Sequence, residues 1–171
     1  MVALQPGTRA LLSILQAHPS LRWEIRAAPD RTLLYSGSFF RPVWKEIADL
    51  KRTRPELASK ETLPDVLARL PVPGTKYSSL LAFVEDVEQP WQPDGYTVWR
   101  ALSGIFASNA VGKVSFQIGA GVEPSKVFAA TELNVLLRNQ KVDHVTRDLL
   151  AYFKRCVETR QPGINLGFIA S

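Results

Sequence analysis

The chain has 171 residues, of which 46% are hydrophobic and 22% charged, and its formal net charge is +5. These values are those of an ordinary globular protein with a core of useful size, so the sequence predicts one α+β domain over residues 1–171. Its single cysteine excludes an intramolecular disulfide and favours a reducing compartment.

The sequence predicts neither a membrane-spanning helix nor a secretory signal. No apolar run approaches the ~20 residues that a membrane-spanning helix requires. The segment from Met1 to Gly7 lacks the basic and apolar regions of a secretory signal. A cytoplasmic protein without a membrane span is therefore expected.

The first predicted elements are a short helix and a β-hairpin. Thr8 can cap a helix that ends near Pro19. Apolar and polar residues then alternate from 21 to 27, residues 28–31 supply Pro and Asp for a turn, and residues 32–36 return as a second strand. The two strands are expected to pair with each other.

Helices and connections follow the hairpin. Helical spacing covers residues 39–51, and a charged connection over 52–60 leads to a short helix that begins at Thr62. Residues 77–87 fit either a helix or a buried strand, and the helix is favoured. A Pro-rich loop over 89–95 contains Trp91, and residues 96–108 form another predicted helix.

The strongest pattern lies between Lys113 and Cys156. Residues 113–118 alternate strictly, which predicts a strand with one buried and one polar face. A glycine turn and a helix opened by Pro124 follow. A last helix is predicted from apolar positions three and four apart, and residues 164–169 resemble a closing strand. Those apolar positions are Val142, Val145, Leu149, Phe153 and Cys156.

Together these elements predict an α+β fold in which helices pack on a small, mainly antiparallel sheet of about four strands. The order of elements is neither a regular βαβ alternation nor a helical bundle.

The glycine turn is a candidate anion site. A strand runs through the turn into a helix N-terminus, where free N–H groups favour a phosphate or carboxylate. The turn lacks both the P-loop spacing and the third glycine of a dinucleotide fingerprint, so a purely structural connection is the favoured interpretation. The residues concerned are Gly119, Gly121, Ser125 and Lys126.

Other chemistry is sparse, so no catalytic residue, metal site or cofactor is predicted. The two histidines, His18 and His144, are not near a serine or cysteine in a known nucleophile arrangement. Two histidines and one cysteine are too few for a multi-ligand zinc site. Cys156 falls on the apolar stripe of the last helix, where a buried inert thiol is expected.

The charges are unevenly distributed, which favours an interaction surface. Basic residues concentrate in 41–60 and 138–160, whereas 77–99 contains acidic residues and neither Lys nor Arg until Arg100. Tryptophan is a frequent interface anchor. The candidate interaction residues are Lys51, Arg52, Arg54, Trp91, Arg147, Lys154 and Arg155.

The sequence therefore favours a non-enzymatic interaction protein or structural subunit of an assembly, acting through separate basic and acidic surfaces on a protein partner or on copies of itself. Two alternatives stay open. One is a small enzyme or ligand-binding domain with an anion site at the glycine turn, and the other is a basic protein that binds nucleic acid.

Overall fold

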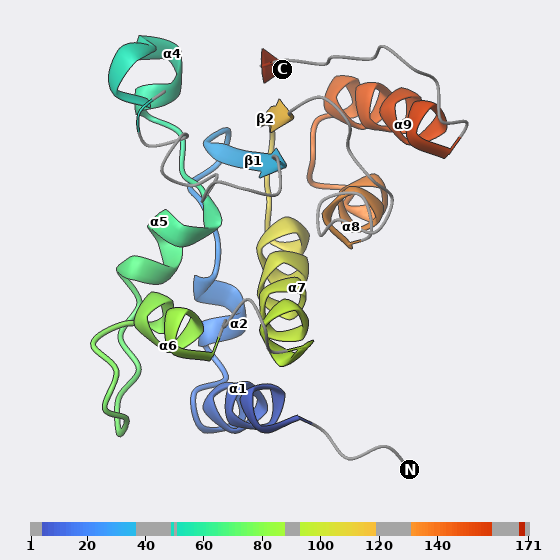
Figure 1. Ribbon diagram of the computed structural model, residues 1–171. Coiled ribbons are helices and arrows are strands. Elements are labelled where there is room, and N and C mark those ends of the chain that lie inside the picture. Colours follow the sequence, from blue (N-terminus) through green and yellow to red (C-terminus); the bar gives the residue numbers. More distant parts are fainter. Residues whose placement is uncertain are drawn as a thin grey trace.

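The computed structural model describes residues 5–36, 49, 51–87, 93–118, 131–158 and 168–169, and these residues are mostly helical. The sheet contains a parallel pair of strands, β1 and β2, with helices on either side of it (Figure 1). In chain order they are α1 (Pro6–Ala17), α2 (Leu21–Glu24), β1 (Thr32–Ser36), α4 (Pro55–Ala58), α5 (Leu63–Ala68), α6 (Leu80–Val87), α7 (Pro93–Ser108), β2 (Val114–Ile118), α8 (Leu133–Arg138), α9 (His144–Glu158) and β3 (Phe168–Ile169).

The predicted sheet is wrong in both size and direction. β1 and β2 pair in parallel, from Thr32 opposite Val114 to Ser36 opposite Ile118. Within the described residues only β3 adds an antiparallel partner, through two residue pairs with β2. Because parallel strands need a long crossover, the chain passes through α4, α5, α6 and α7 between β1 and β2.

The predicted hairpin does not form, because its first strand is largely a helical turn. Leu21 and Ile25 are four positions apart and are both buried, so one turn of α2 brings them to the same side. The alternation from 21 to 27 fits this turn as well as it fits a strand. The second predicted strand is confirmed as β1, but its partner is β2.

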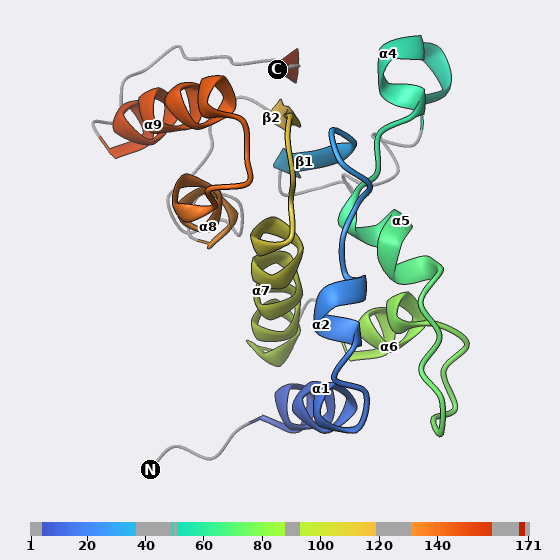
Figure 2. The same cartoon turned by 180° about the vertical axis from the view of Figure 1, so that it is seen from behind.

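The sheet is covered on both faces, contrary to the expectation that 113–118 has a polar face. Leu33 and Leu34, which point to opposite sides of β1, are both buried, and Ser115 of β2 is as buried as Val114 and Phe116. The two views agree that α8 and α9 lie on one side of the strand pair and α4, α5 and α6 on the other (Figure 2). Burial on both faces is typical of parallel sheets.

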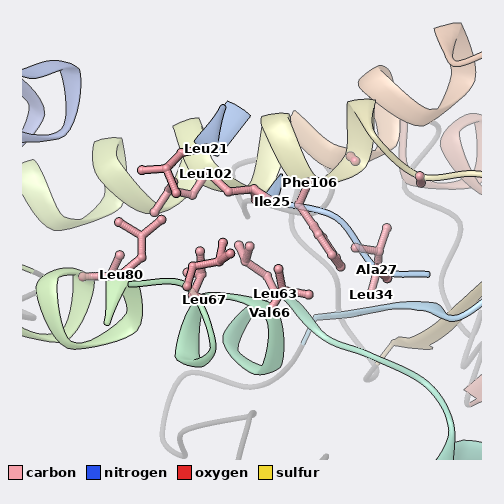
Figure 3. Close-up of a cluster of buried hydrophobic side chains, with 14 of the residues drawn as sticks. Leu21, Ile25, Ala27, Leu34, Leu63, Val66, Leu67, Leu80, Leu102 and Phe106 are labelled. Carbon is pink, nitrogen blue, oxygen red and sulfur yellow. The ribbon is translucent and has the colours of Figure 1, made fainter. Parts of the chain in front are cut away.

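A continuous core joins the helices to the sheet. Figure 3 shows part of this core, in which Leu102 and Phe106 of α7 face Val66 and Leu67 of α5. Each such side chain contributes roughly 1.5–3 kcal/mol when it is fully removed from water. The side chain of Leu34 extends the core to β1.

Several predicted helices are confirmed, with shifted ends. α1 begins at Pro6, so Thr8 lies inside it and Gln5 occupies the N-cap position. α6 confirms a helix over 80–87, and α7 begins at Pro93, three residues before the predicted start at 96. The connection 52–60 is more ordered than expected, because residues 51–53 are helical and α4 follows.

The last helix, α9, is confirmed, but its buried face is partly wrong. Thr146, Leu150 and Phe153 are buried, whereas Val145 is 58% exposed. Phe153 is buried, as predicted, and so is Val142 before the helix, whereas Thr146 and Leu150 take the core positions predicted for Val145 and Leu149. Thr146 lies in the core although it is polar, and Val145, one residue before it, lies at the surface.

Some expectations concern segments outside the described residues. These are most of the helix over 39–51, the turn and helix from Gly119 to residue 130, Trp91, the first part of the closing strand, and the side chain of Cys156.

The short helix α5, whose predicted start at Thr62 is confirmed, has a complete capping box. The Thr62 Oγ1 accepts a hydrogen bond from the Asp65 N–H at 3.3 Å, and the Asp65 carboxylate accepts one from the Thr62 N–H at 3.0 Å. We expect Thr62→Ala to lower the free energy of unfolding by about 1 kcal/mol. Urea denaturation measures this loss, and Thr62→Ser should recover most of it. Equal stability of Thr62→Ala and the unmodified protein would contradict the cap.

Candidate functional site

The most distinctive exposed feature of the described surface is a tryptophan beside two cations. The Arg26 guanidinium carbon lies 4.1 Å from the centroid of the Trp23 ring, and the Lys141 ammonium nitrogen lies 5.6 Å from it. Both distances are within the range of cation–π attraction. The Trp23 side chain is nevertheless 51% exposed. We call these three residues the Trp23 platform.

The exposure of Trp23 follows from the turn of α2. Because Leu21 and Ile25 point into the core, the residue midway between them points away from it. Asn109, just beyond α7, fixes this orientation. Its side-chain amide donates hydrogen bonds to the carbonyl oxygens of Arg22 at 2.6 Å and Ile25 at 3.0 Å.

Lys141 reaches the platform from the turn between α8 and α9. Its N–H donates a hydrogen bond to the side-chain oxygen of Asn139 at 3.0 Å. The Asn139 amide donates in turn to the carbonyl oxygens of Ala107 at 3.0 Å and Ala110 at 2.9 Å. Both halves of the platform are therefore anchored to the C-terminal end of α7 and the turn after it.

Gly112 joins the three segments that meet beneath the platform. Its N–H donates to the Lys141 carbonyl oxygen at 2.8 Å, and its own carbonyl accepts from the Asp143 N–H at 2.8 Å. The next residue, Lys113, donates its N–H to the Asp30 carboxylate at 2.8 Å. Gly112 has a φ of +78°, and a Cβ there would lie 2.1 Å from an Asp30 carboxylate oxygen. Only glycine fits this position.

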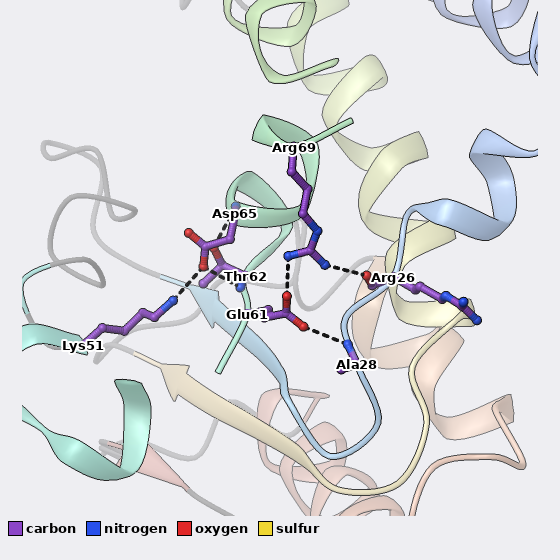
Figure 4. A network of polar contacts seen from close by, with 7 residues as sticks. All are labelled: Arg26, Ala28, Lys51, Glu61, Thr62, Asp65 and Arg69. Carbon is purple, nitrogen blue, oxygen red and sulfur yellow. Dashed lines mark hydrogen bonds and ion pairs between the residues drawn. The ribbon is translucent and has the colours of Figure 1, made fainter. Parts of the chain in front are cut away.

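Most carboxylates near these segments are used within the fold. Asp30 accepts the Lys113 N–H, and Asp143 accepts the N–H of Val145 at 2.8 Å. Glu61 accepts the Ala28 N–H at 2.8 Å and pairs with Arg69 (Figure 4). Glu24 of α2 is exposed, and the structure describes no hydrogen bond or ion pair of its carboxylate.

The cations of this region face solvent instead. Five of them are exposed and form no ion pair with a carboxylate that the structure describes, namely Arg22, Arg26, Arg31, Lys113 and Lys141. Arg31 and Lys113 immediately precede β1 and β2, and the parallel pairing of these strands places both residues at the same end of the sheet. The surface around Trp23 is therefore basic, with its positive charge available to a partner.

The basic residues chosen from the sequence do not form one surface. Lys51 binds the Asp65 carboxylate at 2.9 Å, and Arg52 pairs with Asp49. Burial tends to raise the pKa of Asp65, but hydrogen bonds from Thr62 and Lys51 hold this pKa below its ordinary value. Residues 51–54 adjoin α4, which lies across the sheet from α9 in both views (Figure 1).

The candidates on α9 lie apart from the Trp23 platform. The Nε of Arg147 is buried without a hydrogen-bond partner, and Lys154 is half-buried. The Arg155 guanidinium lies 5.9 Å from the ring of Tyr152, which is 50% exposed. Trp91 and the four candidate anion-site residues, Gly119, Gly121, Ser125 and Lys126, lie outside the described residues.

Two of the acidic residues of the segment 77–99 lie on α6. Glu85 and Asp86 are exposed, and the Asp86 carboxylate accepts a hydrogen bond from the Tyr77 hydroxyl at 2.5 Å. This hydrogen bond raises the pKa of Tyr77. Lys76 lies 3.9 Å from the same carboxylate, so the acidic charge of α6 is partly balanced by the residue that precedes the region.

A buried carboxyl group lies away from the platform. Glu132, just before α8, is almost fully buried, and this burial raises the pKa of its side chain to about 8. The Ser103 hydroxyl of α7 opposes the shift, although its oxygen lacks a hydrogen bond of ordinary geometry. Glu132 is therefore largely protonated at neutral pH.

Sequence reasoning missed all three platform residues. The alternation predicts Trp23 on the same strand face as Leu21 and Ile25, whereas the spacing of four between those two buried residues fits the helical turn that separates Trp23 from them. Nothing in the sequence links Lys141 to Trp23, because their proximity depends on the packing around α7.

The described part of the chain shows neither a metal-binding cluster nor a membrane-spanning helix. No group of three or more His, Cys, Asp or Glu side chains there could hold a metal ion. None of the described helices is long and apolar enough to cross a membrane.

No protein-family model, curated protein or solved structure matches the chain.

Proposed function

We propose that the protein is a non-enzymatic interaction protein that binds an anionic partner through the Trp23 platform. The observation that carries this proposal is the half-exposed Trp23 beside Arg26 and Lys141, in a region whose cations lack a described carboxylate partner. Tryptophan and arginine are the residues most enriched at the energetic centres of interfaces. Exposed positive charge also accelerates the encounter with an acidic molecule.

The proposal keeps the assembly role that the charge distribution suggests. An acidic partner protein or a second copy of the chain could supply the carboxylates, and Glu85 and Asp86 on α6 are exposed in this chain. Light scattering at low and high salt tests self-association directly. A mass above the monomer that falls with salt would identify a copy of the chain as the partner.

Charge reversal at the platform tests the proposed function. We expect Arg26→Glu/Lys141→Glu to abolish the binding of labelled polyanions, namely poly-glutamate, a heparin fragment and an oligonucleotide, measured by fluorescence anisotropy in 50 mM salt. The melting temperature should change little, because both side chains are exposed.

The matched control is Arg52→Glu/Arg54→Glu, which alters the net charge by the same amount on the segment beside α4. This control should bind nearly as well as the unmodified protein. If only the control loses binding, residues 51–54 form the contact, as the sequence suggested. If no polyanion binds the unmodified protein, the proposed function is wrong.

A further inference from the structure

We propose that the anionic partner of the Trp23 platform is a single-stranded nucleic acid, an inference that rests on the proposed function. The platform combines two kinds of contact on one exposed site. Its cations, Arg26 and Lys141, suit phosphate groups, and the indole of Trp23 offers a flat apolar surface. Proteins that bind single strands combine a basic surface with aromatic side chains in this way.

The exposed indole distinguishes a nucleic acid from a simple acidic peptide. Carboxylates would need only the cations and would leave half of the Trp23 side chain in water. A nucleobase can cover that surface by stacking, either on the indole or on the outer face of a guanidinium that is itself stacked on it. The guanidinium of Arg26 lies 4.1 Å from the ring centroid and suits this second arrangement.

Single strands are favoured over duplexes because bases in a duplex are already stacked on each other. The platform has one aromatic ring, which is carried on a single turn of helix. In the described chain, this ring does not lie on a long helix of the kind that enters a groove of duplex DNA. Such a ring can bind only a base that is free to leave its neighbours.

The surrounding charges extend the site beyond one nucleotide. Arg22 precedes Trp23 on the same turn, and Lys113 follows Gly112, which bonds directly to the backbone of Lys141. All of these cations are exposed and without a described carboxylate partner. Their positive charge adds to the attraction of this region for phosphates, without reading a base sequence.

The test measures the anisotropy of labelled 15-nucleotide poly-dT and poly-U with the full chain. We expect Trp23→Ala to weaken binding roughly tenfold to hundredfold through lost stacking. Trp23→Phe should recover part of this loss, because it restores an aromatic face. Arg26→Ala/Lys141→Ala should lower the slope of log K against log salt by about 0.7 for each phosphate contact that is lost.

Tyr152→Ala is the matched control. Tyr152 is 50% exposed and has Arg155 at 5.9 Å from its ring, but it lies on α9. This variant should bind as the unmodified protein does, and thermal melts should show all variants folded. An equal loss for Tyr152→Ala and Trp23→Ala would overturn the assignment to the platform.

Competitors separate the possible partners. A duplex of the same sequence should bind more weakly than the single strand, and binding that is equal for both and insensitive to Trp23→Ala would overturn stacking. If poly-glutamate binds and neither oligonucleotide does, the nucleic-acid inference is wrong while the proposed function stands. If no polyanion binds, both are wrong.

Discussion

As the pH rises from 5 to 8, the protein should lose stability, because Glu132 is buried in its protonated form. Its pKa is about 8 in the folded chain, against 4.5 for the unperturbed group. Between these values the folded state holds a proton that the unfolded state releases, so raising the pH favours unfolding. The loss begins near pH 4.5 and ends near pH 8, and each pH unit within that window costs at most about 1.4 kcal/mol.

Glu132→Gln isolates this effect, because glutamine has nearly the same shape and cannot ionise. We expect the urea-derived free energy of unfolding of the variant to depend much less on pH, so that it exceeds that of the unmodified protein at pH 8 by a few kcal/mol. Every other group that titrates in this range contributes equally to both proteins. Parallel stability profiles would show that Glu132 is ionised in the fold, or that water reaches it.

Gly112→Ala should be among the most damaging single substitutions in the described chain. Alanine at a φ of +78° is strained, which costs roughly 1–3 kcal/mol, and its Cβ would also meet the Asp30 carboxylate at 2.1 Å. Relief of this contact would break the hydrogen bond from Lys113 to Asp30. We therefore expect a loss of about 3 kcal/mol or more in denaturant melts, together with weaker binding at the platform.

Gly74→Ala is the matched control for that substitution. Gly74 has almost the same φ, +77°, but no heavy atom beyond its two chain neighbours lies within 4 Å of the Cβ position. It should therefore lose only the same backbone contribution, roughly 1–3 kcal/mol, and less than Gly112→Ala loses. If the two variants lose the same stability, the packing of Asp30 against Gly112 contributes nothing.

Local signals were predictable from the sequence, and pairings between distant segments were not. The start of α5 at Thr62 was predicted from residues that are neighbours in sequence, and its capping box likewise joins residues three apart. β2 was located by its alternation, but no alternation shows which strand lies alongside it or in which direction. Ser115 looked exposed because serine is polar, whereas its small side chain fits between the sheet and the helices that cover it.

The same limit explains the outcome for the site. The predicted basic residues were chosen because they are neighbours in sequence, yet Lys51 and Arg52 pair with acidic side chains. Trp23 and Arg26 are three residues apart in sequence, but Lys141 becomes their neighbour only when α2, α7 and the α8–α9 turn pack together. The interaction function therefore remains a proposal argued from charge, and we place its contact at the Trp23 platform instead of at residues 51–54.

The anchoring of the platform to the end of α7 couples binding to the integrity of the whole chain. Trp23 and Lys141 are held by Asn109, Asn139 and Gly112, so a ligand that bridges them binds only a chain in which both segments are docked. Such a ligand stabilises the native state by mass action, by about 2.7 kcal/mol at one hundred times its dissociation constant. Amide hydrogen exchange near residues 21–25 and 139–143 should consequently slow together when the platform is occupied, although these two segments belong to opposite ends of the sequence.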